Sequence, residues 1–159
     1  MGFPKQEVLE TILSRLAEIM RLQDWDIELQ LLTLGDLSKT YGVEAQTLRG
    51  DCTRDLKHNE AIINLNVDYD PSDKMGKDSE NWWYKTLIHE LHHITTARYE
   101  CYAVEAVSHL ESQSLIDNTN ANMLVEYENI TSTFAKVFTS VYPLEKCLED
   151  VNLSWEDIK

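Results

Sequence analysis

The chain has 159 residues, which is about the length of one domain. Its 28 acidic residues outnumber its 14 basic ones, so the formal net charge is −14. Such a surface repels phosphate backbones and anionic lipids, so neither nucleic acid nor a membrane is expected as a partner. The sequence has no run of about 18 apolar residues and no N-terminal apolar segment before a cleavage site, which predicts a cytoplasmic protein. Cys52, Cys101 and Cys147 are far apart and are expected to be free thiols.

The first half of the sequence carries one helical pattern and three strand patterns. Apolar residues three or four positions apart predict an amphipathic helix over residues 8–20. Alternating apolar and polar residues predict strands over residues 25–31 and 61–67, and a weaker strand over residues 41–53, interrupted at Gly50. Turn-forming and polar residues separate these elements, with a turn at Leu34-Gly35-Asp36 and a loop over residues 71–80.

The second half is predicted to be helical. A first helix is expected over residues 79–99, a weaker one over residues 102–115, and a break at residues 117–120. A third helix, over residues 123–141, has the clearest apolar stripe: Met123, Tyr127, Ile130, Phe134, Val137 and Val141. The order of elements predicts one α+β domain over residues 1–159, with helices packed on a small, mainly antiparallel sheet of about three strands.

Residues 89–93, His-Glu-Leu-His-His, match the pattern His-Glu-x-x-His within the predicted helix at 79–99. Residues four apart share one helical face, so His89 and His93 can both reach one ion at the about 2.0–2.1 Å of a Zn–N bond. Glu90 lies about 60° around the helix from His93, where its carboxylate can take a proton from water on the ion. The unbroken helix, with an apolar stripe opposite the histidines, favours a metal site over ordinary surface residues.

The other histidines are expected to have different roles. His92 is three residues from His89, but a pair using His92 would leave Glu90 on the far side of the ion. We therefore expect His92 to be exposed or to support a ligand. His58 has no evident partner in the sequence, and His109 is expected on the surface.

A third ligand must come from elsewhere, because catalytic zinc keeps three protein ligands and an open position. The metzincin arrangement would need Gly at position 96 and His at position 99, where this chain has Thr96 and Tyr99. A downstream carboxylate is the remaining common solution. Glu126 and Glu128 lie on the predicted helix 123–141. Other acidic residues are Glu105 and Glu111, which are available, and Glu100, which lies too far along the axis of the first helix.

Helical periodicity leaves Glu126 and Glu128 open. Glu126 lies about 60° from the centre of the apolar stripe and Glu128 about 130° on the other side, so amphipathicity favours Glu126. Glu128, however, shares its flank with Leu124, Thr131 and Ala135, a small-residue edge that would let the metal helix approach closely.

The segments at residues 86–93 and 126–135 resemble the small gluzincin-type metallopeptidases, especially those encoded by phages and prophages. The ImmA/IrrE group has a similar layout, and the SprT-like group is a more distant zincin relative. The resemblance covers the two helices and implies Zn²⁺ as the cofactor. In such families a Glu six residues before a Phe-Ala pair supplies the third ligand, which implies Glu128 before Phe134-Ala135.

Motif and resemblance together predict zinc-dependent hydrolysis of peptide bonds in a peptide or protein substrate, with Glu90 as the general base. In zincins an edge strand beside the metal helix binds the substrate backbone, a role that the resemblance gives to Asn59–Val67. The alternative is a zinc-stabilised binding or regulatory module without turnover. Four residues are candidates for stabilising the oxyanion: Tyr84, Arg98, Tyr99 and His109.

Overall fold

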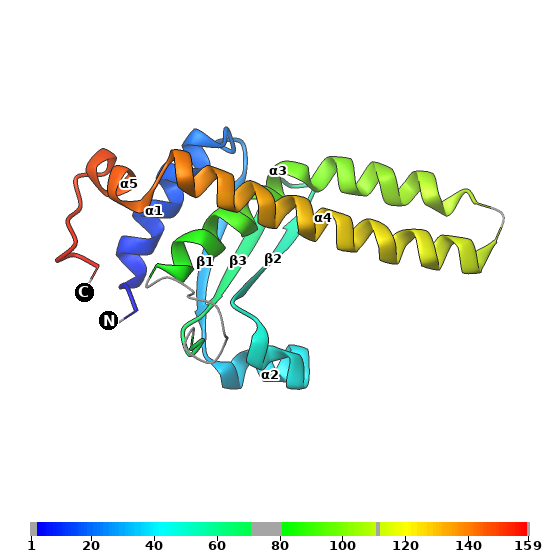
Figure 1. Cartoon of the computed structure of the whole chain (residues 1–159), viewed down its shortest axis with the longest axis horizontal. Helices are drawn as coiled ribbons and strands as arrows, with labels where there is room; N and C mark the ends of the chain where they lie inside the picture. Colours follow the sequence, from blue (N-terminus) through cyan, green and yellow to red (C-terminus); the bar gives the residue numbers. More distant parts are fainter. Residues whose placement is uncertain (1–2, 71–80, 111, 159) are drawn as a thin grey trace.

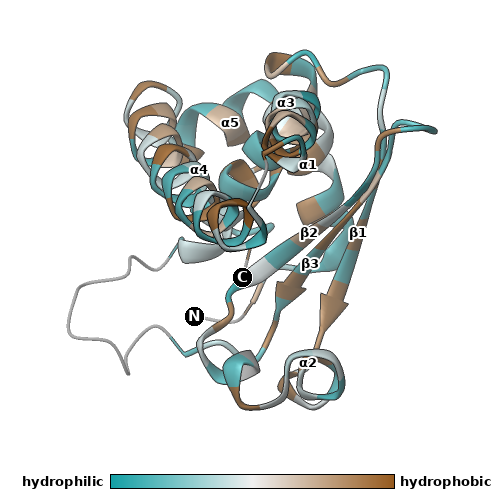
Figure 2. Ribbon diagram, turned by 90° about the vertical axis from the view of Figure 1, so that its right-hand side faces the viewer, coloured by the Kyte–Doolittle hydropathy of each residue, from teal (hydrophilic) through white to brown (hydrophobic). Residues whose placement is uncertain are grey.

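The computed structural model describes residues 3–70, 81–110 and 112–158, and it has the predicted α+β architecture. Helices and a three-stranded sheet make up the described part of the chain, with most helices gathered on one side of the sheet (Figures 1 and 2). The predicted loop over 71–80, the first residues of the helix expected from 79, and the candidate Glu111 lie outside the described residues. Within the described part, no helix combines the length and apolar character that crossing a membrane requires.

The sheet is mixed, with strand order β1-β3-β2. β1 (Asp26–Leu32) pairs in parallel with β3 (Glu60–Asn66), whereas β2 (Gly50–Asp55) pairs antiparallel with β3. The expected antiparallel pairing therefore applies to β2 and β3. The connection from β1 to β2 contains two short helices, α2 (Leu34–Tyr41) and the 3-10 helix η1 (Gly42–Thr47).

The predicted turn at residues 34–36 is wrong, because these residues form the first turn of α2. Thr33 and Asp36 make a reciprocal capping box: the Thr33 hydroxyl accepts from the Asp36 amide, and the Asp36 carboxylate accepts from the Thr33 amide. The strand expected over residues 41–53 is wrong in its first part. Gly42–Thr47 form η1, and the strand β2 begins only at Gly50.

β3 is the central strand, which corrects the expectation that Asn59–Val67 offers a free edge. The Asn66 amide donates to the Arg49 carbonyl, which fixes the alternation of hydrogen bonds between β2 and β3. Every second residue of β2, beginning with Asp51, therefore directs its backbone N–H and C=O groups toward β3. The backbone groups of the residues between them, Gly50, Cys52 and Arg54, point away from the sheet. The edge beside the long helix that follows the sheet is therefore β2.

Two helices pack their predicted apolar stripes on one face of this sheet. α1 (Gln6–Ile19) buries four residues of the stripe predicted for residues 8–20, and α3 (Trp82–Ser108) packs on β2 and β3. The buried residues of α3 include Trp83, Leu87, Leu91 and Ile94, which form an apolar stripe. α5 (Leu144–Asp150), a short helix that was not predicted, packs on α1 and buries Leu144, Cys147 and Leu148.

α3 and α4 (Gln113–Val141) form a long hairpin that extends past the sheet (Figure 1). α3 continues through the expected boundary at residues 99–102, and α4 contains residues 117–120, which were expected to break it. Polar residues there remain compatible with a helix, since Gln113 donates to the Asp117 carboxylate one turn along. Packing between the two helices outweighs the weak local preferences.

The buried face of α4 differs from the predicted stripe. Ile130, Val137 and Val141 are 54%, 57% and 72% exposed, whereas Thr131 and Ala135 are buried. α4 packs mainly on α3, so only a narrow face is covered, and small residues occupy the line of closest approach. Thr131 and Ala135 of the expected small-residue flank therefore face α3, together with Phe134 of the predicted stripe, whose ring stacks on His92 of α3.

A glycine at the start of β2 allows α3 to approach the sheet. A Cβ atom at Gly50 would lie 2.6 Å from the Asn64 carbonyl oxygen and 2.8 Å from Cγ2 of Thr86.

Gly50→Ala should therefore lower the free energy of unfolding by about 1–3 kcal/mol, measured by urea denaturation. The control is Gly35→Ala in α2, where the nearest atom is Thr33 Oγ1 at 3.6 Å. Its stability should be unchanged or higher, and equal losses in both variants would contradict close packing at Gly50.

Candidate metal centre

α3 brings the two motif histidines together one turn apart. Nε2 of His89 and Nε2 of His93 are 3.2 Å apart, and the ring centroids are 4.9 Å apart with an interplanar angle of 75°. Leu87, Leu91 and Ile94 anchor the opposite side of this helix in the core. The two nitrogens therefore converge on one point beside the helix.

Glu128 on α4 completes this convergence. Its Oε2 lies 3.3 Å from Nε2 of His89, and its Oε1 lies 3.2 Å from Nε2 of His93. The Glu128 side chain is 51% exposed, so solvent reaches the group from the α4 side. Hydrogen bonds to His89 and His93 hold the pKa of Glu128 well below its usual value.

These separations match those expected of zinc ligands. Two ligand atoms at about 2.0–2.1 Å from one tetrahedral ion lie about 3.3 Å from each other. The three observed separations, 3.2, 3.3 and 3.2 Å, fall at that value. Two imidazoles and one carboxylate are also a donor set that catalytic zinc uses in proteins.

His92 fixes α4 beside α3. It is buried, not exposed; its Nδ1 shares a 3.1 Å hydrogen bond with Thr131 Oγ1, and its ring stacks on Phe134 with centroids 4.1 Å apart. Thr131 lies less than one turn after Glu128 on α4. The contact therefore sets the position from which Glu128 reaches the imidazoles, which agrees with a supporting role for His92 and rules out the exposed one.

Glu90 lies beside the ligand atoms on the side of the sheet. His89, Glu90 and His93 each bring a ligand-type atom within 4.8 Å of the other two. The Glu90 side chain is buried, with the residue only 5% exposed, and this burial raises its pKa to about 7 although His89 and His93 oppose the shift. Glu128 lies within 3.3 Å of both Nε2 atoms, whereas Glu90 lies within 4.8 Å of the ligand-type atoms of the two histidines.

A second carboxylate, Glu100, faces the other ring nitrogen of His93. Its Oε1 lies 3.8 Å from His93 Nδ1, which is too long for a direct hydrogen bond but close enough for strong electrostatic interaction. Arg54 on β2 donates to Glu100 Oε2 at 2.8 Å and to the His93 carbonyl at 2.7 Å. Thr96 donates to Glu100 Oε1 at 2.6 Å. These contacts tie the His93 segment of α3 to the sheet.

The same contacts explain two pKa values. Burial opposes a positive charge on His93, but the carboxylates of Glu100 and Glu128 outweigh it and raise the pKa of His93 to about 9. Burial also opposes the charge of Glu100, yet His93, Thr96 and Arg54 together lower the pKa of Glu100 to about 2. Both groups are therefore charged near neutral pH unless a cation displaces the proton of His93.

The remaining sequence candidates do not join this centre. Glu126 lines a separate apolar depression on α4 with Met123, Tyr127 and Ile130, and Glu105 is exposed farther along α3. Among the proposed oxyanion stabilisers, Tyr84 is buried and donates to the Tyr142 carbonyl. Arg98 donates to Asn59, Tyr99 is largely exposed, and His109 caps the distant end of α3.

Sequence reasoning misjudged or missed several neighbours of the centre. It named Glu100 but set it aside as too far along the helix axis, although Glu100 is seven residues, two helical turns, after His93 and so lies on the same face. Arg54 and the pair Tyr41–Asp51 carried no sequence signal. The Tyr41 hydroxyl donates to Asp51 at 2.6 Å, which raises the pKa of Tyr41 to about 12, and the charge of Glu90 contributes to this rise. Tyr41 therefore lies within electrostatic reach of Glu90.

Another group of ligand-type residues lies at the turn between β2 and β3. Asp55, His58 and Glu60 also place ligand-type atoms within 4.8 Å of one another, but all three residues are exposed. His58, expected to have no partner, pairs through Nδ1 with Asp55 Oδ2 at 2.9 Å. Asp55 also accepts from the Lys57 and His58 amides, so local turn contacts account for this arrangement.

Comparison with known proteins adds no further identification. No family model, no curated protein and no solved structure matches this chain. The geometry of the candidate centre is therefore the observation from which a function can be argued.

Proposed function

We propose that this chain is a zinc-dependent metallopeptidase of the gluzincin type. His89, His93 and Glu128 hold the ion, and Glu90 is the general base. The proposal depends chiefly on one observation, the convergence of the three predicted ligands: Nε2 of His89 and Nε2 of His93 are 3.2 Å apart, and each lies 3.2–3.3 Å from one of the two Glu128 carboxylate oxygens. The motif within α3 and the resemblance of the two helices support the same assignment.

Zinc held by these residues would supply a Lewis acid and a water molecule acidified to a pKa of about 7. With zinc in place, Glu90 would be the residue that accepts a proton from water and donates it to the leaving amine. Its buried position keeps bulk water from competing for this proton. Protein ligands for zinc must be deprotonated, so metal binding displaces the proton that Glu100 and Glu128 favour on His93.

The substrate would bind along β2 as an added strand. The outward backbone groups of Gly50, Cys52 and Arg54 provide donors and acceptors beside α3, and within the described residues no other strand pairs with this edge. Cys52 lies within electrostatic reach of Glu90, which contributes to the raised pKa of the thiol after burial, the larger cause. A peptide extended along β2 would therefore pass the general base. The proposed substrate strand therefore lies beside β2, and not beside Asn59–Val67.

The ligand assignment predicts which substitutions remove zinc. Loss of a residue that only supports a ligand typically weakens metal binding by about 10–100-fold. The loss of zinc affinity should be larger for each of three variants: His89→Ala, His93→Ala and Glu128→Ala. Glu126→Ala should bind zinc like the parent, because Glu126 lies away from the imidazoles. Competition against graded chelators, with elemental analysis, measures zinc binding by all four variants. Stronger loss in Glu126→Ala than in Glu128→Ala would overturn the assignment.

Glu90→Gln separates an enzyme from a binding module. The variant should retain stoichiometric zinc and cleave peptides about 10²–10⁴-fold more slowly, because the amide cannot accept the proton. Turnover of a fluorogenic peptide library, with Glu105→Gln as the matched control on α3, provides the measurement. Equal cleavage by Glu90→Gln and the parent would exclude Glu90 as the base. A zinc-loaded parent that cleaves none of the library would favour the module without turnover.

Glu100 should orient His93 and strengthen its binding to the ion. Glu100→Ala should therefore weaken zinc binding by about 10–100-fold while preserving the fold, since it removes a carboxylate that faces the second ring nitrogen. Glu105→Ala, on the exposed side of the same helix, should have no effect. Chelator competition and circular dichroism together test this role. Unchanged zinc affinity in folded Glu100→Ala would show that Glu100 serves only the contact with Arg54.

A further inference from the structure

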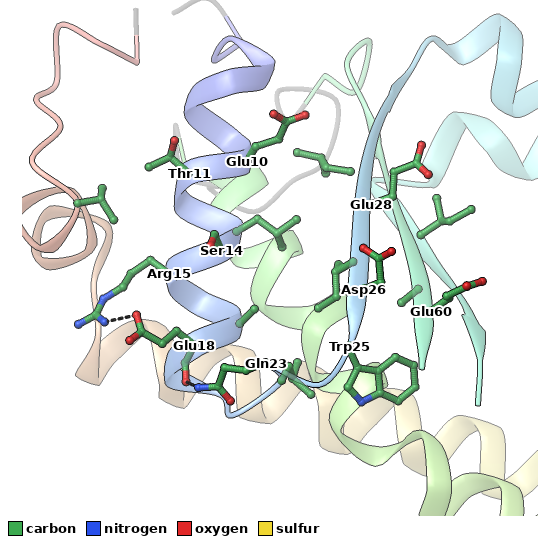
Figure 3. A pocket seen from close by; sticks show the side chains of 18 of the residues that line it. Glu10, Thr11, Ser14, Arg15, Glu18, Gln23, Trp25, Asp26, Glu28 and Glu60 are labelled. Carbon is green, nitrogen blue, oxygen red and sulfur yellow. Dashed lines mark hydrogen bonds and ion pairs between the residues drawn. The ribbon is translucent and has the colours of Figure 1, made fainter. Parts of the chain in front are cut away.

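A groove lies between α1 and β1, at the opposite edge of the sheet from the candidate metal centre. It encloses about 1410 Å³. Figure 3 shows Glu10 on α1 at one side of β1, and Asp26 and Glu28 at the other side of this strand, with Glu60 of β3 beyond them. Leu13, Leu29 and other apolar side chains also line the groove. Because β3 separates β1 from β2, this groove is distinct from the proposed substrate edge.

The groove is much more acidic than the chain as a whole. Seven of its lining residues are acidic and one is basic, compared with two acidic residues per basic residue over the full sequence. The basic residue, Arg15, is occupied by Glu18 at 2.6 Å and Asp150 at 2.8 Å. Within the described residues, no ion pair reaches the other five carboxylates, which belong to Glu7, Glu10, Asp26, Glu28 and Glu60. These carboxylates repel one another and would be stabilised by a cationic ligand.

The open edge of β1 supplies backbone groups along the same groove. The Asp26 amide donates to the Asn59 carbonyl and the Val67 amide donates to the Leu32 carbonyl, so the even-numbered residues of β1 face β3. Ile27, Leu29 and Leu31 consequently direct their N–H and C=O groups toward the open edge. Within the described residues, the one side-chain contact recorded there is a 3.5 Å approach of Gln6 Nε2 to the Leu29 carbonyl.

We propose that this groove binds an extended, cationic segment of a partner protein, which adds to the sheet as a strand beside β1. Backbone hydrogen bonds to Ile27, Leu29 and Leu31 would hold the segment, and the carboxylates would select positive charge. The site does not depend on metal binding or on peptide hydrolysis, so it stands independently of the proposed function.

The two faces of β1 specify the pattern of this segment. Asp26 and Glu28 project from the outer face of the strand, whereas Leu29 is buried on the inner face toward α1. An added strand alternates its side chains between the same two faces. Cationic side chains would therefore lie beside Asp26 and Glu28, and apolar side chains would point toward α1. The expected ligand is a strand of alternating basic and apolar residues.

The test uses the full chain and a blocked, fluorescent peptide of sequence Lys-Val-Lys-Val-Lys-Val-Lys. Anisotropy should show binding that weakens with added salt and no binding of the Glu-Val counterpart. The double variant Asp26→Asn, Glu28→Gln should bind about 10-fold more weakly, since two ion pairs are lost. The control Glu105→Gln, Glu126→Gln removes the same charge from the hairpin and should change affinity little. Equal loss in the two double variants would mean non-specific attraction and would overturn the proposal.

Strand addition is tested separately with two N-methylated peptides, one modified at every Val and one at every Lys. Only one set of amides faces β1 in either strand direction, so one peptide should lose binding about 10-fold or more and the other should retain it. Amide chemical shifts should change at Ile27, Leu29 and Leu31. Equal binding of both peptides, or shift changes confined to Gly50, Cys52 and Arg54, would overturn the assignment to β1.

Discussion

The contact between His92 on α3 and Thr131 on α4 is the interaction on which the candidate centre depends. A helix by itself can place two imidazoles on one face, but a third protein ligand must arrive from another element. The buried hydrogen bond of 3.1 Å, the stacking of His92 on Phe134 and the small residues Thr131 and Ala135 bring α4 close to α3. Glu128 lies three residues before Thr131 on α4, so the same contact carries its carboxylate to the two Nε2 atoms.

A second layer of contacts joins the centre to the sheet. Gly50 allows α3 to approach β2, and Arg54 on the same face of that strand binds both Glu100 and the His93 carbonyl. Contacts with the sheet and contacts with α4 therefore both hold the part of α3 that carries the motif histidines. Such a frame would hold the proposed ligand side chains in position before an ion arrives, which would reduce the reorganisation that binding costs. The sheet contributes to the site through packing and through the open edge of β2.

Both edges of the small sheet are unpaired within the described residues, and their surroundings differ. β2 lies beside α3 and the buried Glu90, where backbone recognition would present a peptide to chemistry. β1 lies beside α1 in a groove with five carboxylates outside any described ion pair, which favours recognition of charge without a catalytic group. The excess of negative charge read from composition is therefore unevenly distributed over the fold.

The sequence by itself determined the α+β class, the helix that carries His89, Glu90 and His93, and the apolar stripes of α1 and α3. These features are local, because helical and strand periodicities depend on near neighbours along the chain. The tertiary structure decided that β3 is central, that α2 replaces the predicted turn, and that Thr131 and Ala135 form the buried face of α4. It also brought Arg54, Glu100 and His92 into contacts around the ligand group. Each of these outcomes depends on residues far apart in sequence, whose packing no local pattern specifies. For the same reason, Glu128 could be distinguished from Glu126 only once the two helices were placed together.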